Sequence, residues 1–483
     1  MNKQIGRLAT AFVVLLVALI ANLSFIQVIN ADSIDNKSGN RRNLLREYSR
    51  ERGPILVMGN PIASSVATSD TLNHLRTYAD GPEYASVTGF YSFLYGATGI
   101  ERAQNSVLSG SADSLVIDRL QQLFAGRKPR GGAVSLTINP AAQAAAWKAL
   151  RGRTGAVVAI EPQTGRILAL VSSPSFDPNL LSSHDAAAIK QSYANYLADP
   201  QQPMLNRALA RTYPPGSTFK LVTAAAALAS GRFTADSTLP GPRNYRLPLT
   251  TKDLNNWSKR ACGARNKVTL AQALAMSCNT AFAWLGNQLG AEALQRQARA
   301  FGFDFATKVP MTAATSHFPA HPDAPQTALS AIGQFDVRAT ALQMAQVGAS
   351  IGNRGNLMAP YLVDELLGPD LSVLSRTTPQ LRSKAMTDVN AEILLNMMEG
   401  VVSRGTGSNA RISGVRVAGK TGTAQTQPGT PPHAWFVGVA PVGNPRVAVA
   451  VVIENGGGAS EISGNHLAAP VARAVMRAVL AGK

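Results

Sequence analysis

The chain has 483 residues, and at roughly 150 residues per domain this length suggests two or three domains. Lys and Arg outnumber Asp and Glu by 46 to 28, so the net charge is +18, which favours either contact with polyanions or a solvated basic surface. The sequence contains no internal repeat and no low-complexity tract, which excludes a repeat array or a chain built of biased segments.

An apolar segment near the N-terminus, Leu8 to Ala31, contains no Asp, Glu, Lys or Arg and is long enough to span a membrane. A cleaved signal peptide is the alternative, but its apolar region is normally about 7 to 15 residues long and ends at a small-residue cleavage site. No clear site of that kind follows here, so we prefer an uncleaved anchor with a short tail, residues 1–31. Basic residues lie on both sides, and the positive-inside rule therefore does not place the larger part of the chain.

A polar, arginine-rich stretch follows the anchor, from Asp32 to Arg52, and we interpret it as a stalk. From about residue 55 to 130, short apolar runs alternate with Gly, Asn and Pro turn signals, which favours an irregular, partly β accessory domain. The segment Gly126–Gly132 is the best linker candidate. We therefore predict an N-terminal accessory domain over residues 32–130 and a larger domain over 131–483.

The larger domain has strand patterns at both of its ends and Ala/Leu-rich helical stretches between them. Two apolar runs that flank the turn EPQTG predict a hairpin. The predicted elements are a strand at 134–139, a helix at 140–150, strands at 156–160, 166–170, 415–418, 435–440 and 446–453, and a helix at 468–481. Together they predict an α+β domain, with one antiparallel five-stranded sheet flanked by helices and a helical subdomain.

Ser217 and Lys220 form an S-x-x-K pair at the start of a predicted helix. Residues three apart share a helix face, so Lys220 can reach the Ser217 hydroxyl. A serine needs a base to act as a nucleophile, and burial together with a second cation, such as Lys420, would lower the pKa of Lys220 enough for that role. Taken alone, an S-x-x-K pair is more often a helix cap with a surface lysine.

Ser277 and Asn279 form an S-x-N pair after another helical run. In an extended turn both side chains point the same way, so that Ser277 can relay a proton to a leaving amine while Asn279 holds a substrate amide. An ordinary helix cap is the alternative. Cys278 lies between them, sixteen positions after Cys262. In an exported protein such a pair forms either a disulfide, worth on the order of 3 kcal/mol, or two buried thiols, and spacing does not decide between these.

The sequence Lys420-Thr421-Gly422-Thr423 continues the strand predicted at 415–418. On an edge strand, Lys420 and Gly422 face one side and the two threonines face the other, unless a twist of the strand lets several of these groups line one cleft. Lys420 and the threonine hydroxyls suit a substrate carboxylate, and Gly422 lets another backbone approach closely. The N–H of Thr423 can share an oxyanion with the N–H of Ser217. A basic edge strand that resists aggregation is the alternative.

Other functions fit the sequence less well. Residues 414–421 match the phosphate-loop pattern G-x-x-x-x-G-K-T, but their interior is strand-like, and Gly- and Pro-rich residues replace the helix that should follow. The six histidines form no H-E-x-x-H and no G-x-S-x-G is present, which disfavours zinc hydrolases and Ser-His-Asp hydrolases. Nucleic-acid binding would rest on charge alone. We predict no metal, no cofactor and no nucleic-acid partner.

In their order, the motifs resemble those of the penicillin-binding proteins. The resemblance covers the anchor, Arg52-Gly-Pro-Ile, and the sequences EPQTG, YPPGSTFK, SCNT, AGKTGTAQ and HAWFVG. The residues between anchor and catalytic region are too few for a glycosyltransferase domain, so the chain is similar to the monofunctional class B members. The resemblance implies the fold shared by penicillin-binding transpeptidases and serine β-lactamases, with a smaller pedestal-like or dimerisation-like domain and a single transmembrane helix.

The resemblance also implies a reaction. Ser217 would take the acyl group of the penultimate D-alanine from a peptidoglycan stem peptide that ends in D-Ala-D-Ala, and an amine of a neighbouring stem would then attack to form the crosslink. The implied roles are general base for Lys220, proton relay for Ser277, partner of the substrate amide and of Lys220 for Asn279, and binding of the terminal carboxylate or of a β-lactam for Lys420, Thr421 and Thr423.

The resemblance further implies an extracytoplasmic catalytic domain anchored in the cytoplasmic membrane, beside a membrane glycosyltransferase and proteins of division or elongation. The chain departs from many class B members at Gly333-Gln334-Phe335, which lacks their second glycine. No E-x-x-L-N follows Asn279, so the deacylating glutamate of class A β-lactamases has no counterpart and we predict a long-lived penicilloyl enzyme. A β-lactamase or β-lactam sensor and a non-catalytic division scaffold are the alternatives, and sequence does not separate transpeptidation from D,D-carboxypeptidation.

Overall fold

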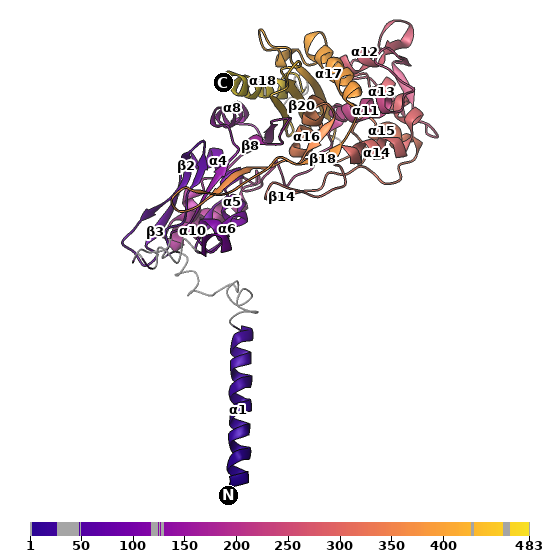
Figure 1. Ribbon diagram of the computed structural model, residues 1–483. Coiled ribbons are helices and arrows are strands. Elements are labelled where there is room, and N and C mark those ends of the chain that lie inside the picture. Colours follow the sequence, from indigo (N-terminus) through magenta and orange to yellow (C-terminus); the bar gives the residue numbers. More distant parts are fainter. Residues whose placement is uncertain are drawn as a thin grey trace.

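The computed structural model describes residues 2–26, 48, 50–116, 124, 126, 130–426, 429–456 and 464–482. Two folded parts lie side by side, an accessory region (residues 50–130) and a main region (residues 131–482), as Figure 1 shows. Most of the predicted stalk and part of the predicted linker, Gly126–Gly132, lie outside the described residues.

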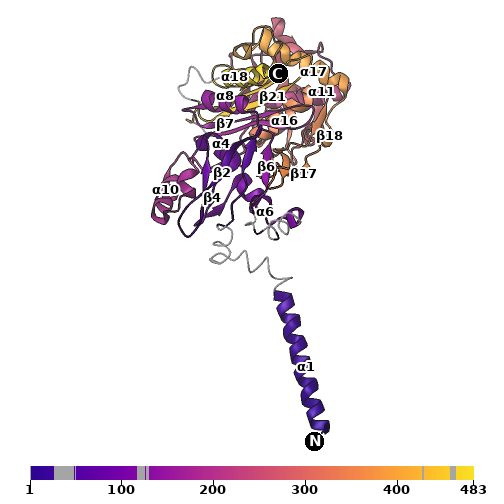
Figure 2. The ribbon, with the colours of Figure 1, turned by 60° about the vertical axis from the view of Figure 1, so that its left-hand side comes forward.

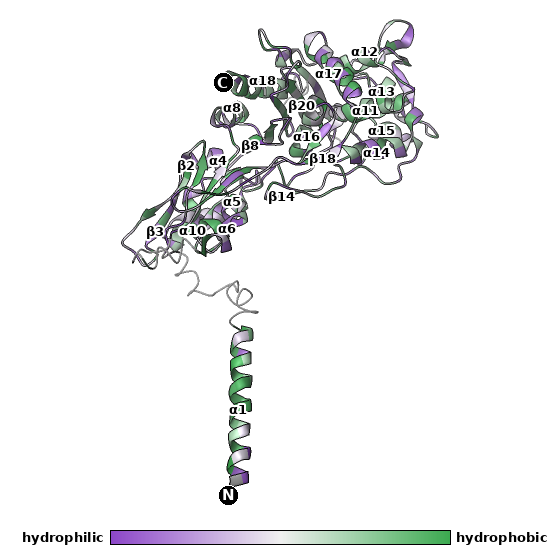
Figure 3. Ribbon diagram, viewed as in Figure 1, coloured by the Kyte–Doolittle hydropathy of each residue, from purple (hydrophilic) through white to green (hydrophobic). Residues whose placement is uncertain are grey.

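Helix α1 (Asn2–Ser24) is the one helix in the described ranges that is long and apolar enough to cross a membrane. Its side chains are exposed along its length, for example 70% of Phe12 and 68% of Leu15. Most of its surface is hydrophobic, with a hydrophilic N-terminal end (Figure 3). An apolar helix of this length needs lipid or another apolar surface to cover it, as the predicted anchor requires.

A six-stranded sheet joins the accessory region to the main region. Strands β1 and β6 pair in parallel and all other neighbours are antiparallel. Strands β6, β16 and β17 come from the main region, so the sheet continues across the boundary predicted between residues 130 and 131. In sheet order the strands are β17 (Val373–Arg376), β16 (Val363–Leu367), β6 (Ala133–Leu136), β1 (Ile55–Val57), β2 (Asn60–Ala67) and β3 (His74–Tyr78).

A buried ion cluster holds the start of the accessory region. Glu101 is fully buried and accepts hydrogen bonds from Arg52 Nε at 2.6 Å and Arg76 Nε at 2.7 Å. Arg52 also covers the ring of Tyr91, 4.1 Å from its centroid. Burial alone would raise the pKa of Glu101, but the two guanidinium groups outweigh burial and lower it. The Arg52-Gly-Pro-Ile motif therefore has a structural role. The described part of this region includes the helices α4 (Gly81–Thr88), α5 (Gly99–Ala103) and α6 (Asn105–Leu108), and a short hairpin that joins β4 (Tyr91–Ser92) to β5 (Gly96–Ala97).

We expect Glu101→Gln to lower the free energy of unfolding by about 3 kcal/mol, because it leaves two buried guanidinium groups without a countercharge. Urea denaturation of the full chain in detergent measures the effect. The matched control is Glu392→Gln on an exposed face of α17 (Asp388–Ser403), which should change the value by less than about 0.5 kcal/mol. Equal midpoints for the two variants would show that the cluster adds no stability.

The main region is built around a five-stranded antiparallel sheet. Both faces of this sheet are covered, so its central strand is apolar at every position: Val449 and Val451 pack in the cluster with α8 and α18, and Ala450 and Val452 in the cluster with α16. The helices lie on both sides of the strands in Figure 2. The predicted α+β fold with five antiparallel strands is confirmed. In sheet order the strands are β19 (Ala418–Ala424), β20 (His433–Ala440), β21 (Val447–Ile453), β7 (Gly155–Ile160) and β8 (Ile167–Ser173).

A helical subdomain lies between the two groups of strands in the sequence, as predicted. The helices of the main region are α8 (Pro140–Leu150), α9 (Asn179–Ser182), α10 (Ala186–Ala198), α11 (Lys220–Ala229), α12 (Leu270–Ala275), α13 (Asn279–Leu289), α14 (Ala291–Ala300), α15 (Ala324–Ser330), α16 (Ala341–Gly352), α17 and α18 (Ala468–Ala481). Its two-stranded sheets pair β9 (Thr238–Pro240) with β12 (Lys267–Thr269), β10 (Asn244–Arg246) with β11 (Asp253–Asn255), β13 (Thr307–Lys308) with β14 (Thr312–Ala313), and β15 (Asn356–Met358) with β18 (Leu381–Lys384).

The strand predicted at 415–418 was wrong in position. Strand β19 begins only at Ala418, so residues 415–417 lie outside it, whereas the prediction that the Lys-Thr-Gly-Thr motif continues the strand is confirmed. Gly414 has a φ of 74°, and the chain reverses there with Ile412 bridged to Val415, which keeps the preceding residues out of the sheet. Strand β19 continues past Thr421, and the described residues from 421 to 426 contain no helix. A phosphate loop needs a helix at this point, so the structure also disfavours that interpretation.

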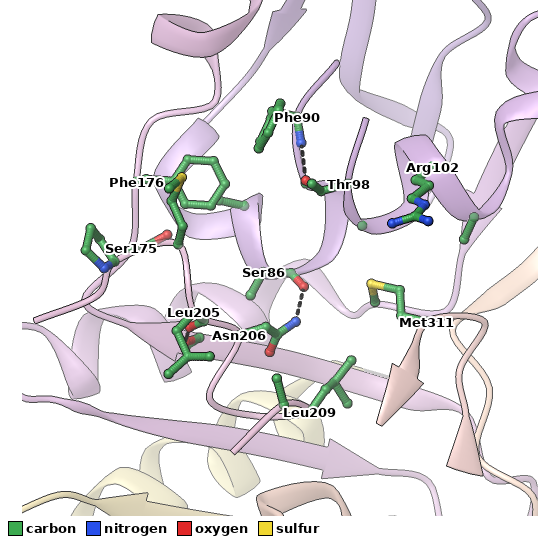
Figure 4. A pocket seen from close by; sticks show the side chains of 18 of the residues that line it. Ser86, Phe90, Thr98, Arg102, Ser175, Phe176, Leu205, Asn206, Leu209 and Met311 are labelled. Atoms are coloured by element: carbon green, nitrogen blue, oxygen red, sulfur yellow. Dashed lines mark hydrogen bonds between the residues drawn. The ribbon is translucent and has the colours of Figure 1, made fainter. Parts of the chain in front are cut away.

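A cavity of about 690 Å³ lies between the accessory and main regions (Figure 4). Across it, Asn206 Nδ2 donates to the carbonyl of Ser86 at 2.7 Å. The rings of Phe90 and Phe176 meet edge to face with centroids 6.1 Å apart. These contacts, together with the shared sheet, hold the accessory region against the part of the main region that carries α10.

Candidate active site

Ser217 lies in a 3₁₀ turn, Gly216–Phe219, that leads directly into α11. Its predicted place in the first turn of a helix is confirmed. Gly216 has a φ of 53° and donates its N–H to the carbonyl of Gly333 at 2.9 Å. A Cβ atom on Gly216 would lie 2.8 Å from the carbonyl oxygen of Thr423, so the turn packs directly against β19. Ser217 is partly exposed beside this strand.

Gly422 makes this approach possible from the side of the strand. A Cβ atom there would lie 2.9 Å from Trp435 Cβ and 3.0 Å from the carbonyl oxygen of Pro215. Strand β19 is the edge of its sheet, as predicted, so its free side faces the turn of Ser217. The close backbone approach predicted for Gly422 is therefore present, and the neighbour is the turn that carries the serine.

Two buried lysines meet at the hydroxyl of Ser277. Lys220 Nζ lies 2.8 Å from the carbonyl oxygen of Ser277, 2.8 Å from Asn279 Oδ1 and 3.3 Å from Ser277 Oγ. Lys420 Nζ donates to Ser277 Oγ at 2.9 Å and to the carbonyl of Thr421 at 2.9 Å. The structure therefore brings together residues from three motifs that are up to 200 positions apart in the sequence.

Neither lysine forms an ion pair within the described residues, although both are fully buried. Burial lowers the pKa of Lys420 to about 7. Burial, and in addition the charge of Lys420, lowers the pKa of Lys220 well below its usual value. The predicted electrostatic effect of Lys420 on Lys220 is thus confirmed. A neutral Lys220 has two N–H donors and one lone pair, which is what a base for a hydroxyl proton requires.

The hydrogen bonds of Lys220 differ from the expected contact. Among the described residues they join Lys220 to Ser277 and Asn279, and none joins it to Ser217. The lysine lies at the start of the same helix but points across to the S-x-N pair, because the carbonyl and amide oxygens there satisfy its donors. Transfer of the Ser217 proton therefore needs a small movement of Lys220, or a path through the Ser277 hydroxyl.

The prediction that the S-x-N turn is extended was wrong. Ser277 has a φ of 59°, in the left-handed region, and Asn279 is the first residue of α13. The two side chains still point to the same amine, as predicted, because the left-handed residue turns the chain between α12 and α13. Cys278 forms a disulfide with Cys262, which resolves the alternative left open by the sequence and ties this turn to the preceding loop.

Two residues that the sequence motifs do not include support the site. Asn256 is buried, and its Oδ1 accepts the N–H groups of Asn279 at 3.0 Å and Thr280 at 3.1 Å, which caps α13. Its Nδ2 donates to two carbonyls of the preceding loop, those of Pro242 and Arg260. The sequence around Asn255 and Asn256 does not indicate that Asn256 caps α13, because a capping asparagine normally stands directly before its helix.

Thr406 is the second such residue. Its hydroxyl lies 2.8 Å from Thr421 Oγ1, and its N–H donates to the carbonyl of Ala275, at the end of α12. It therefore joins β19 to the helix that leads into Ser277. Thr423 is partly exposed on the same strand. Within the described part of the chain, no group of three or more His, Cys, Asp or Glu side chains is placed to hold a metal ion.

We expect Asn256→Ala to lower the free energy of unfolding by about 1 kcal/mol or more, since it removes a helix cap and leaves the N–H groups of Asn279 and Thr280 without the acceptor that they have here. The acylation rate by penicillin should fall about tenfold at a temperature where the variant is folded, because Asn279 loses its fixed position. Asn244→Ala, an exposed asparagine of β10, is the matched control. An acylation rate equal to that of the control would show that the cap serves folding alone.

Comparison with known families agrees with this geometry. The model of the penicillin-binding protein transpeptidase domain matches residues 155–477, and that of the penicillin-binding protein A dimerisation domain matches residues 52–134. The chain belongs to the penicillin-binding protein family. The resemblance inferred from the motifs is thus confirmed, together with the fold that it implied.

Relatives of known function match over the whole length. The peptidoglycan D,D-transpeptidase PbpA of Mycolicibacterium smegmatis is 46% identical, with 99% of both chains covered. PbpA of Mycobacterium tuberculosis is 44% identical, with both chains covered completely. Among solved structures, the ceftriaxone acyl-enzyme complex of penicillin-binding protein A from M. tuberculosis superimposes with a TM-score of 0.88 at 45% identity, covering 90% of this chain and all of that one. This penicillin-binding protein is therefore similar to class B members of the penicillin-binding protein A type.

Proposed function

We propose that this penicillin-binding protein is a peptidoglycan D,D-transpeptidase, which crosslinks stem peptides through an acyl-enzyme at Ser217 and is acylated there by β-lactams. The observation that supports it best is the Ser277 hydroxyl held between the amines of Lys220 and Lys420, beside the turn of Ser217. This arrangement supplies a base of lowered pKa and a proton relay without any histidine.

Acylation begins when Lys220 takes the proton of Ser217, directly or through Ser277, and Ser217 Oγ attacks the carbonyl carbon of the penultimate D-alanine. The bond from that carbon to the nitrogen of the last D-alanine breaks, and Ser277 passes a proton to the leaving amine. Backbone N–H groups of Ser217 and Thr423 stabilise the oxyanion. Lys220 then passes the proton that it took to Ser277, so both groups return to their starting states. An amine of a second stem attacks the ester carbon and gives up a proton to Lys220, the bond from that carbon to Ser217 Oγ breaks, and Ser217 Oγ takes a proton back from Lys220 or through Ser277. The crosslink thus forms without an external energy source.

Carboxylate binding falls to strand β19. The Lys420 amine and the hydroxyls of Thr421 and Thr423 hold the terminal carboxylate of the stem, or the carboxylate of a β-lactam. Lys420 is itself a residue of this strand, and its contact with Ser277 couples substrate binding to the proton relay. Asn279 accepts a hydrogen bond from Lys220 and also binds the substrate amide.

The domain division and the cellular setting belong to the same proposal. Residues 1–31 form the tail and anchor, 32–130 the accessory domain and 131–483 the transpeptidase domain, which acts outside the cytoplasmic membrane because its substrate lies there. The chain works beside a membrane glycosyltransferase in division or elongation, since the residues between its anchor and its catalytic region are too few for a glycosyltransferase domain. Support for the membrane setting comes from α1 alone.

The products separate the possible reactions. The full chain is incubated in detergent with uncrosslinked peptidoglycan strands whose stems end in D-Ala-D-Ala. We expect free D-alanine and crosslinked stem dimers in comparable amounts, both abolished by penicillin. D-alanine release without dimers would identify a D,D-carboxypeptidase, and absence of both products would reject the proposed reaction.

A further inference from the structure

A strongly basic loop lies directly behind the S-x-N turn. The segment between residues 241 and 267, which we call the basic lobe, contains seven Lys and Arg and a single Asp, a net charge of +6 out of +18 for the whole chain. It holds the hairpin of β10 and β11 and ends at β12. The seven basic residues, all exposed, are Arg243, Arg246, Lys252, Lys259, Arg260, Arg265 and Lys267.

Most of these charges are uncompensated. Arg246 pairs with Asp253 at 2.5 Å, and none of the other six forms an ion pair within the described residues. Exposed like charges gathered in one loop repel one another and add nothing to folding, so a bound anion is the simplest use for them. Trp257 lies among them with 67% of its surface exposed, and an exposed indole ring offers a flat face to a ligand.

The basic lobe is fixed to the catalytic machinery. Its Cys262 is bonded to Cys278, its Asn256 caps α13, and the carbonyl of Asn255 accepts from Asn279 Nδ2 at 3.2 Å. Trp257 follows Asn256 directly. A strand held on the lobe would therefore pass beside Ser277 and Asn279.

We infer that the basic lobe is the docking surface for an uncrosslinked peptidoglycan strand, held through its carboxylates. This inference rests on the proposed function. Each uncrosslinked stem ends in a carboxylate, so a strand that carries many stems is a polyanion, whereas strand β19 with Lys420 binds the terminal carboxylate of a single stem. Docking of neighbouring stems on the lobe raises the local concentration of reactive stems at the acyl-enzyme.

Membrane lipid is a poorer partner for this surface. The described chain enters the accessory region at Arg50, and the basic lobe, between α11 and α12, lies at the opposite end of the folded part, beside α12 and α13 (Figure 1). Anionic headgroups act only within about a Debye length, roughly 8 Å at physiological salt. A nucleic acid is also a polyanion and could bind the same basic residues, so the experiment below includes a DNA duplex.

The test compares two triple variants of the full chain in detergent, each with Ser217→Ala to prevent turnover. The lobe variant is Lys259→Gln, Arg260→Gln and Arg265→Gln. The control variant removes three exposed charges from the far face of the sheet, Lys148→Gln, Arg473→Gln and Arg477→Gln. Binding to soluble uncrosslinked strands is measured at low and at high salt. We expect about tenfold weaker binding for the lobe variant alone, and a weaker salt dependence.

The readouts with Ser217 restored separate this inference from the proposed function. The lobe variant should show a raised KM for strands with little change in kcat, because it loses binding shared by ground and transition states. Equal affinity of lobe and control variants would overturn the inference, and so would equal binding of strands whose carboxylates have been converted to amides. Tighter binding of a DNA duplex or of phosphatidylglycerol vesicles would overturn it as well. If the unaltered chain is not acylated by penicillin, the proposed function fails instead.

Discussion

Ser217→Ala is expected to abolish the covalent adduct with penicillin. The unaltered chain should gain the mass of one drug molecule, because Ser217 Oγ opens the β-lactam amide and keeps the acyl group as an ester. Without the hydroxyl, the rate of acylation should fall by about 10⁴-fold or more, since the other hydroxyl of the turn, on Thr218, is fully buried and donates to the carbonyl of Pro215. Intact mass spectrometry over several hours measures both the amount and the lifetime of the adduct.

A serine at the far end of helix α11 provides the control. Ser230 lies at the exposed end of α11, and Ser230→Ala should be acylated like the unaltered chain. The adduct should persist for hours, because no glutamate corresponding to that of class A β-lactamases follows Asn279. An adduct that disappears within seconds would point to a β-lactamase. An adduct on Ser217→Ala would place the nucleophile elsewhere.

Much of the fold and of the site could be predicted from the sequence, for two physical reasons. The strands of the main sheet are buried on both faces, so runs such as 446–453 are continuously apolar and easily recognised. The site motifs combine residue types that rarely occur together at such short spacing. Lys220 and Lys420 could also be expected to influence each other, because burial and a nearby cation both lower the pKa of a lysine toward the value that the chemistry needs.

The errors and omissions have equally specific causes. The strand at 415–418 was misplaced because alternation in Val-Arg-Val-Ala outweighed the turn signal of Gly414, whose left-handed φ reverses the chain. The six-stranded sheet was not foreseen, since it pairs β6 with β16 across more than 200 residues, and a local pattern contains no information about such partners. Asn256 caps a helix that begins 23 residues later, so only the folded chain reveals it.

The left-handed residues near the site show how the fold positions the nucleophile. Gly333 receives the N–H of Gly216, and a Cβ atom on Gly333 would lie 2.1 Å from the carbonyl oxygen of Gly216. Phe335, at the position where many class B members have a glycine, also has a positive φ, of 60°. A bulky residue adopts this conformation at a cost, so the surrounding structure imposes it. The segment 333–335 thus supports the turn of Ser217 from behind, although it contributes no catalytic group.

The pH dependence of acylation provides the second large effect. In the unaltered chain, kcat/KM for penicillin should rise as Lys220 loses its proton, at a pH well below the usual lysine value, and fall near pH 7, where Lys420 loses its own. The profile is therefore expected to be bell-shaped and to report the free enzyme, with apparent pKa values that belong to the coupled pair. The carboxylate of penicillin stays ionised throughout this pH range, so its titration does not affect the pH profile of kcat/KM.

Lys420→Met should change this profile in a defined direction. Without the charge of Lys420 nearby, protonation of Lys220 costs less free energy. The pKa of Lys220 therefore rises, and the acid limb moves to higher pH. The alkaline limb disappears, because the group that causes it is gone. At pH 7 the rate should fall about 10³-fold, since the smaller fraction of neutral Lys220 adds to the lost contacts with the carboxylate and with Ser277. The second-order rate constant of acylation, measured by mass spectrometry across the pH range, gives both limbs.

A charge-matched variant separates this local effect from a general loss of charge. Lys190 is exposed on α10, and Lys190→Met should leave both limbs unchanged, because solvent screens its charge. If Lys420→Met lowers the rate but leaves the acid limb in place, Lys420 serves carboxylate binding alone and burial suffices to lower the pKa of Lys220. If both limbs move as expected, the two lysines act as one titrating unit, and the Ser277 hydroxyl between them is the path by which a proton leaves Ser217 and reaches the departing amine.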